Sequence, residues 1–183
     1  MANETGAVPD PERVADQLAI QHVLAQHSRG VDRADGKILE SAYWPDAEVA
    51  YGGFNGKAHD FCAMLPDAIR QFAHTQHSIS NFNIEFHGDE ARVETYVRAI
   101  HYTANAAGAD HEMAFFGRYL DRMAKRDGVW KILHRTVVMD WNRHDMVTAV
   151  WDGPPFDGLA RGGRHPEDPL YAHLESGGSG DHG

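Results

Sequence analysis

The chain has 183 residues and a formal net charge of -10, with 42% hydrophobic and 24% charged residues. This length and composition suit one globular domain with short tails, and so acidic a surface disfavours nucleic acid or an anionic membrane as a partner. The single cysteine excludes an internal disulfide, the first residues lack the layout of a signal peptide, and no apolar run approaches the ~18 residues that span a bilayer, so the sequence predicts a soluble cytoplasmic protein.

Helical patterns dominate the first half of the chain, after a tail at residues 1–10 that is expected to be flexible. Asp10 is a suitable N-cap, and Pro11 suits the first position of a helix because an N–H there would have no partner inside the helix. Apolar residues at helical spacing follow. The predicted elements are helices at 11–32, 36–43 and 59–75 and a short strand at 47–51.

The second half changes to long alternating segments rich in Val, Ile, Tyr and Phe, which are typical of strands. The turn sequences His87-Gly88-Asp89 and Asp127-Gly128 are expected to join them as hairpins. The predicted strands are 78–86, 91–104, 112–126 and 129–141. Helices followed by an antiparallel meander indicate an α+β fold.

The composition shifts again after residue 150, where Gly, Pro and Asp become frequent and 8 of the 18 glycines lie at or beyond Gly153. We therefore expect a C-terminal extension at 151–183 that follows a pocket domain at 11–150. A short helix at 168–175 and a disordered end over the last eight residues are expected within it. Its apolar residues, such as Trp151, would let it serve as a lid or as a subunit contact.

Three segments carry a resemblance to a known family. They are Ser28–Gly36 (SRGVDRADG) with Tyr43–Val49 (YWPDAEV), His77–Phe82 (HSISNF), and Gly128–Arg135 (GVWKILHR). In this order and spacing, over about residues 12–145, the chain resembles the SnoaL-like family of the nuclear-transport-factor-2-like superfamily. The resemblance implies a cone-shaped, curved, mixed or antiparallel sheet that packs against the N-terminal helices and encloses a pocket.

The resemblance also implies catalytic residues. In dehydratases and dehydrochlorinases of this family, an aspartate at the end of the first helix orients a histidine that takes a proton from carbon, and Asp32 and His77 match those positions. His101 and Tyr51 fall close to a second histidine and a tyrosine of the dehydratases. Arg135 resembles an arginine of the dehydrochlorinases. A lysine of those enzymes is replaced by His27, which weakens a dehalogenase interpretation because imidazole is charged only at lower pH.

These residue types suit proton transfer from carbon. Imidazole has a pKa near neutral pH, and a carboxylate on its second nitrogen fixes the tautomer and stabilises the imidazolium. Tyr51, His101 or Arg135 would hydrogen-bond an oxygen that gains negative charge. Such acid–base help contributes on the order of 10²–10⁴ in rate, so the substrate should carry its own activating carbonyl or phenol. The residues predicted to bind an apolar aromatic substrate are His27, Tyr43, Phe54, Phe116 and Trp141.

Each assignment has a structural alternative. Asp32 could cap the second helix, His77 could be a strand-end histidine, and Arg135 could form an ion pair within the sheet. Cys62 lies in an apolar helix and is expected to be inert. A metal site is a further alternative, although no metal-binding motif is present and no metal is expected. Its candidate ligands would be His74, His77, His101 and His111.

The sequence thus predicts a cofactor-independent carbon–oxygen or carbon–carbon lyase of the dehydratase type. The resemblance implies that it would eliminate water, or formaldehyde from a lignin-derived diaryl compound, from an aromatic or polycyclic small molecule. An isomerase or cyclase with the same His–Asp pair is one alternative, and a non-catalytic small-molecule-binding or assembly module is another. The expected partners are a small hydrophobic substrate and further copies of the chain, as a homodimer or homotrimer, with no nucleic acid, membrane, cofactor or metal.

Overall fold

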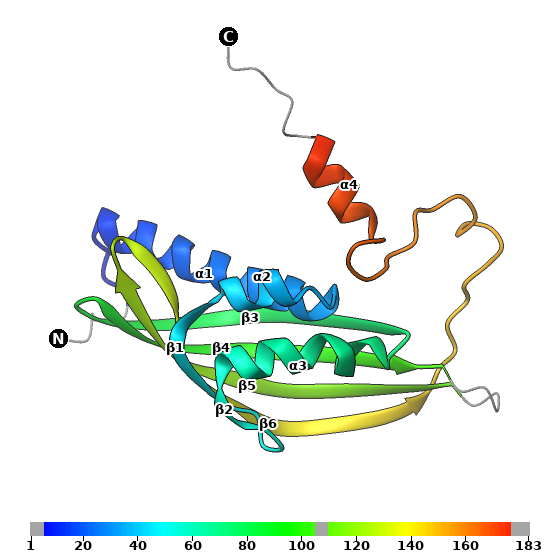
Figure 1. The fold of residues 1–183 in the computed structure, drawn as a ribbon, viewed down its shortest axis with the longest axis horizontal. Helices are drawn as coiled ribbons and strands as arrows, with labels where there is room; N and C mark the ends of the chain where they lie inside the picture. The colour runs from blue at the N-terminus through cyan, green and yellow to red at the C-terminus, as the bar shows by residue number, and fades with distance from the viewer. Residues whose placement is uncertain (1–5, 105–109, 177–183) are drawn as a thin grey trace, which may run out of the picture.

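The computed structural model describes residues 6–104 and 110–176. Figure 1 shows three helices along one side of a long curved sheet, and a C-terminal segment that leaves the end of the last strand. The helices are α1 (Pro11–Asp32), α2 (Gly36–Ser41), α3 (Ala58–Arg70) and α4 (Pro169–Ser176). The strands are β1 (Tyr43–Ala50), β2 (Asn55–Lys57), β3 (His74–His87), β4 (Glu90–Thr103), β5 (His111–Arg126) and β6 (Val129–Met146).

The strands form a single sheet in the order β2-β1-β6-β5-β4-β3. The strands from β3 to β6 pair antiparallel as a meander, whereas β1 lies parallel to β6, so the sheet is mixed. Register shifts, such as the one between Ser80 and Asn83, bend the strands because an extra residue in one strand increases the local twist. The curved, unclosed sheet with its helices confirms the predicted α+β cone.

The two faces of the sheet differ in what covers them. We call the face that carries His77 the inner face, because the side chains of this face, such as Val93 and Ala99, are buried beneath the helices. The opposite face, which carries Arg98, is the outer face, and several large apolar side chains on it are exposed. The hydrophobic core lies between the inner face and the helices. Its members include Ile20, Leu24, Leu39, Phe61, Met123 and Ile132.

The first helix agrees with the sequence prediction, and two others do not. In α1, the Asp10 side chain accepts a hydrogen bond of 2.8 Å from the Glu12 N–H, and Pro11 begins the helix as expected. The predicted helix at 36–43 is too long, because Tyr43 already pairs with Ile132 of β6. The helix predicted at 59–75 ends at Arg70, since the chain from residue 74 onward pairs with β4.

The C-terminal part contains the short helix predicted at 168–175, found as α4. Of the last eight residues, Ser176 ends α4, and 177–183 lie outside the described residues, as do residues 1–5 of the predicted tail and 105–109 of the predicted loop. The divisions at residues 10 and 150 stay predictions. None of the described helices is long and apolar enough to cross a membrane.

Candidate active site

The last residue of α1 meets the start of β3. The Asp32 Oδ1 atom lies 2.7 Å from the His77 Nδ1 atom, and Asp32 Oδ2 accepts a 2.8 Å hydrogen bond from the His77 backbone N–H. Both side chains are largely buried, with 8% of His77 and 12% of Asp32 exposed. Because the backbone contact fixes the carboxylate as well, the pair is held at two points rather than one.

This contact determines what the imidazole can do. A carboxylate oxygen only accepts hydrogen bonds, so it favours the tautomer that carries its proton on Nδ1. No described residue forms a hydrogen bond with the Nε2 atom of His77. This atom is then the basic nitrogen of the ring. A proton taken up there would be stabilised by the negative charge of Asp32.

His101 stands beside this pair on the inner face of β4. Its ring is perpendicular to that of His77, with 5.4 Å between the ring centroids, and it also packs edge-on against Phe72. Burial and the neighbouring His77 lower the pKa of His101 to about 4. His101 is therefore neutral near neutral pH and offers either a donor or an acceptor nitrogen, not a cation.

A second group of polar side chains lies deeper in the cone. His27 of α1 is 1% exposed, and its Nε2 atom lies 3.2 Å from the hydroxyl of Tyr51. The His27 ring packs edge-on against Tyr43. Burial, Arg135 and His77 lower the pKa of His27 well below its ordinary value, so this residue is neutral as well.

Arg135 carries the positive charge of this interior, and it is already paired. Its Nε and Nη2 atoms each donate a 2.7 Å hydrogen bond to Asp121, and its guanidinium lies 3.9 Å from the centroid of the Tyr119 ring. Burial opposes the charged form, but Asp121, Tyr43 and Tyr51 raise the pKa of Arg135 well above its ordinary value. The ion-pair alternative considered for Arg135 is thus realised.

The deep polar cluster, as we call these residues, comprises His27, Tyr43, Tyr51, Tyr119, Asp121 and Arg135. Several of its buried atoms, and two nearby ones, have no hydrogen-bond partner among the described residues. They are His27 Nδ1, Tyr43 Oη, Arg135 Nη1, Thr95 Oγ1 and His101 Nδ1. Since buried polar atoms are normally hydrogen-bonded, these unsatisfied atoms make the deep polar cluster a candidate for contact with a bound molecule.

Two of the predicted substrate-binding residues require a correction. Phe116 and Trp141 stack on each other at 3.8 Å on the outer face of the sheet, where Trp141 is 52% exposed. They are therefore separated from His77 by the sheet. Phe54 packs against Phe61 near Tyr51 and forms part of the apolar wall beside the deep polar cluster.

The histidines considered as metal ligands do not gather. His74 lies on the outer face, where its ring stacks on Trp151, whereas His77 and His101 lie on the inner face. Among residues 6–104 and 110–176, no three His, Cys, Asp or Glu side chains are grouped as a metal site would require. Cys62 is buried, and burial raises its thiol pKa to about 12. Its thiolate, the nucleophilic form, is thus strongly disfavoured.

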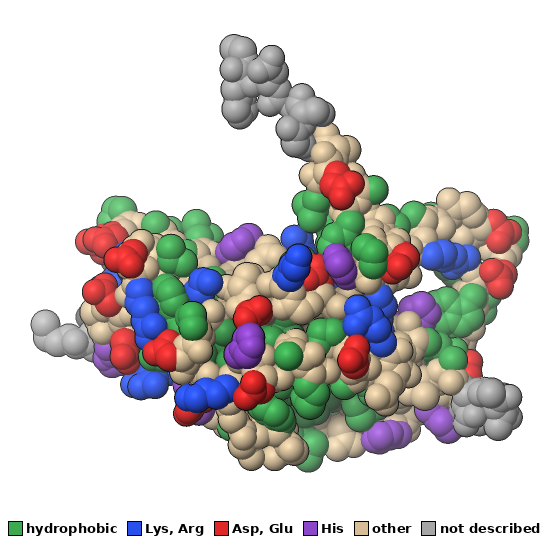
Figure 2. Space-filling model, in the orientation of Figure 1, with side chains coloured by type: hydrophobic (Ala, Val, Ile, Leu, Met, Phe, Trp, Pro, Cys, Tyr) green, Lys and Arg blue, Asp and Glu red, His purple; other side chains and the backbone are tan. Residues whose placement is uncertain are grey.

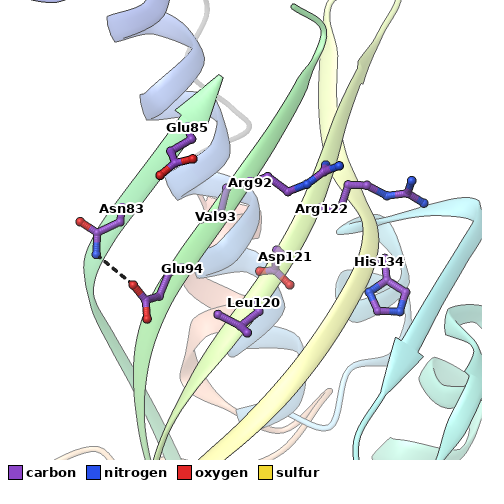
Figure 3. A pocket seen from close by; sticks show the side chains of 9 residues that line it. All are labelled: Asn83, Glu85, Arg92, Val93, Glu94, Leu120, Asp121, Arg122 and His134. Carbon is purple, nitrogen blue, oxygen red and sulfur yellow. Dashed lines mark hydrogen bonds between the residues drawn. The ribbon is translucent and has the colours of Figure 1, made fainter. Parts of the chain in front are cut away.

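Two of the hollows in the described structure help to delimit the candidate site. One, of about 440 Å³, reaches Asp32 between the start of β3 and the C-terminal segment, and Thr75, Trp151 and Arg164 are among the residues that line it. The other, of about 540 Å³, is on the outer face and is shown in Figure 3. Its walls bear both signs of charge, with Glu94 bonded to Asn83 and with Arg92 and Arg122 above β4 and β5. This second hollow contains neither Asp32 nor His77, and Asp121 is the one member of the deep polar cluster among its lining residues. It lies on the opposite face of the sheet from the candidate site.

Residues 12–136 match the family model of the SnoaL-like domain. The chain belongs to the SnoaL-like family. The matched residues include both Asp32 and His77 and the whole deep polar cluster, and the match ends before the C-terminal segment.

Several proteins are similar to this chain over most of their own length. An uncharacterized protein of Mycobacterium tuberculosis is 25% identical over 127 residues, which are 67% of this chain and 84% of that protein. The structure of a candidate scytalone dehydratase from Novosphingobium aromaticivorans is 26% identical, with a TM-score of 0.65 and coverage of 75% of this chain and 93% of that one. A hexachlorocyclohexane dehydrochlorinase from Novosphingobium barchaimii has the same fold at 23% identity, with a TM-score of 0.65 and coverage of 80% and 100%.

Sequence reasoning missed three residues at or beside the candidate site. Asp121 and Tyr119 share the inner face of β5, and only the pairing of Asp121 with Arg135 across two strands brings them into the cluster. Their inward alternation along β5 was the available signal. Arg164, which reaches Asp32 from the C-terminal segment, gives no local signal at all.

Proposed function

We propose that this protein is a cofactor-independent lyase that takes a proton from an activated carbon and expels a small group, with water as the favoured leaving group. The proposed substrate is an aromatic or polycyclic small molecule that carries a carbonyl beside the reacting carbon. The observation that supports this most directly is the buried 2.7 Å contact between Asp32 and His77. The dehydratase and dehydrochlorinase names among chains of the same fold point the same way.

In this scheme, His77 Nε2 removes the proton next to the carbonyl, and the electrons of the C–H bond form an enolate. The enolate then expels the hydroxyl group on the neighbouring carbon as the C–O bond breaks, and the departing oxygen leaves as water after receiving a proton. Tyr51 supplies that proton, and the proton on His77 then passes to Tyr51, directly or through solvent, so that all atoms balance. His101 is neutral and assists by donating a hydrogen bond to the departing oxygen. Burial raises the pKa of Tyr51, which keeps its hydroxyl protonated and able to donate.

The charges of the interior favour a leaving group that departs as a neutral molecule. Arg135 is already neutralised by Asp121, and His27 is neutral because of burial and the nearby Arg135. No additional cation in the deep polar cluster therefore compensates a departing anion such as chloride. Loss of formaldehyde also fits this condition, since it begins with a hydroxyl proton transferred to His77, breaks the carbon–carbon bond, and ends with protonation of the carbon left behind.

The proposal is tested with β-hydroxytetralone, a cyclic β-hydroxy ketone fused to a benzene ring, whose dehydration gives naphthol and is followed by absorbance. We expect His77→Ala to lower the rate by roughly 100-fold or more, and Asp32→Asn to lower it by a similar factor because the wrong tautomer of His77 becomes accessible. His87→Ala serves as the matched control, because His87 lies on the same strand but is exposed at its far end. A folded His77→Ala variant that turns over the probe as fast as the wild type contradicts the proposal.

A second measurement separates proton transfer from elimination. The α-protons of unsubstituted α-tetralone exchange with D2O if His77 acts as a base, whether or not a leaving group is present. Exchange in α-tetralone, combined with no dehydration of β-hydroxytetralone, would support the isomerase or cyclase alternative with the same pair. Saturable binding of the tetralone with no exchange would instead support a binding module and overturn the enzymatic proposal.

A further inference from the structure

The segment that follows β6 returns to the end of α1. We call residues 147–171 the C-terminal strap. Figure 1 shows it in orange, leaving the end of β6 and curving back towards the end of α1, where α4 follows, and Figure 2 shows the same segment at the upper right of the molecule. It lies beyond residues 12–136, so the match to the SnoaL-like domain says nothing about it.

Several contacts fasten the strap to the turn between α1 and α2. The carboxylate of Asp168 lies 3.2 Å from the Arg33 guanidinium, and the backbone N–H of His165 donates a 2.7 Å hydrogen bond to the Arg33 carbonyl. The hydroxyl of Tyr171 donates a 2.8 Å hydrogen bond to the Asp35 carboxylate. The strap is therefore held to the residues that follow Asp32 independently of any single side chain.

Arg164 is the strap residue that reaches the candidate site. Its Nη1 atom donates to the backbone carbonyl of Asp32 and, at 2.7 Å, to the hydroxyl of Thr75. Its Nη2 atom donates to the carbonyls of Phe72 at 3.0 Å and Ile69 at 3.5 Å. One guanidinium thus joins the end of α1, the end of α3, the following turn, and the beginning of β3.

The partners of Arg164 explain why a half-buried cation is stable in this place. All its described hydrogen-bond acceptors are neutral oxygens, and the Asp32 and Ile69 carbonyls lie in the last turns of two helices. The last carbonyls of a helix have no partner within it and carry partial negative charge, which favours a cation. The ends of α1 and α3 meet at this one side chain.

We propose that Arg164 is a positioning residue for the Asp32–His77 pair. It binds the backbone of the residue that supplies the carboxylate and the side chain of Thr75, two residues before His77. By fixing both, it sets the separation of the carboxylate and the imidazole from outside the SnoaL-like domain. The inference deepens the proposed function and rests on it for its catalytic meaning, whereas the hydrogen bond itself can be observed without any substrate.

Proton NMR and kinetics of the Arg164→Gln variant of the full chain test this role. The proton shared by Asp32 and His77 Nδ1 should give a strongly downfield resonance in the wild type. In Arg164→Gln, we expect this resonance to shift upfield or to broaden. The kcat for dehydration of β-hydroxytetralone should fall by about 10- to 100-fold with a smaller change in KM, since misplacement by ~1 Å can cost about 100-fold.

Arg161→Gln is the matched control. Arg161 lies on the same strap and loses the same charge, but its contacts are to Trp151 and Asp152 of the strap itself. Both the resonance and the kinetics should stay at wild-type values in this variant. If Arg164→Gln does not fold, Arg164→Lys replaces it, because lysine keeps the charge at the helix ends but cannot bridge four acceptors. In Arg164→Lys, we expect a smaller fall in kcat and a smaller change in the resonance.

The outcomes distinguish this inference from the proposed function. A folded Arg164 variant with an unchanged resonance and an unchanged kcat overturns the positioning role, as does an effect confined to KM, which would make the strap a substrate contact only. If Asp32→Asn and His77→Ala leave turnover unaffected while Arg164→Gln still alters the resonance, the proposed function fails and the positioning role stands.

Discussion

At the scale of single residues, the charge balance of the interior depends on Asp121. Asp121 and Arg135 have no exposed side-chain surface, and removal of one member of a buried ion pair leaves the other charge without compensation. We expect Asp121→Asn to lower the free energy of unfolding by about 3–5 kcal/mol, measured by urea denaturation. Asp46→Asn is the control, because Asp46 and Arg126 make a similar two-pronged contact at the surface, where solvent screens the pair, and the loss of stability should be much smaller. If both variants lose the same free energy of unfolding, removing the partner of the buried Arg135 is no more destabilising than removing the partner of an exposed arginine, and the prediction is wrong.

Individual residues of the site also differ in whether they can be predicted from the sequence. Asp32 and His77 could be assigned by resemblance because each lies in a recognisable segment, at the end of a helix and at the start of a strand. Asp121 could not, because its role follows from lying opposite Arg135 in the β5–β6 register. The prediction that Phe116 binds substrate is wrong for a related reason. Adjacent aromatic residues on a strand point to opposite faces, and local sequence does not reveal which face is covered.

At the scale of elements, the crossing of α1 and α2 positions the end of α1. A Cβ atom on Gly30 would lie 2.6 Å from the backbone nitrogen of Leu39, a clash with main chain that cannot rotate away. Alanine favours a helix over glycine by about 1 kcal/mol, but overpacking costs about 1–3 kcal/mol, so we expect Gly30→Ala to be net destabilising. Thermal unfolding should show a lower Tm.

Gly36→Ala is the matched control for this helix contact. A Cβ atom at Gly36, the first residue of α2, would lie at an ordinary 3.5 Å from Cys62 and Pro66. This variant should be neutral or slightly stabilised, because it gains helix propensity without a clash. A Gly30→Ala protein as stable as Gly36→Ala would mean that the two helices can separate at no cost.

The elements themselves were largely predictable, and their ends were less so. The cap and proline that begin α1 are local signals, and the long alternating strands need only their own residues. The ends of α2 and α3 are decided by pairing with strands that come much later in the chain, at Ile132 for Tyr43 and at Tyr102 for His74. Both predicted helices include these residues, so the local pattern overestimates the length of each helix.

At the scale of the whole molecule, the strap shows how far apart in sequence the parts of one site can be. Arg164 and Asp32 are 132 residues apart, and no periodicity or motif connects them. The strap also contributes to the hollow of about 440 Å³ that reaches Asp32. The fold of the domain thus follows from patterns along the chain, whereas the support of its candidate site depends on how the last segment closes over the end of the cone.

The response of the whole fold to acid follows from the histidines that it keeps neutral. Burial and His77 lower the pKa of His101 to about 4 from 6.5, so between these values the unfolded chain binds a proton that the folded chain does not. Stability should therefore fall as the pH drops from about 7 to about 5, by roughly 1–2 kcal/mol from this residue. Urea midpoints at these two pH values should differ less in His101→Gln than in the wild type. Carboxylates held ionised, such as Asp168, lose their contribution only below their ordinary pKa of 3.8, outside this window. Parallel pH profiles for the two proteins would contradict a neutral, buried His101.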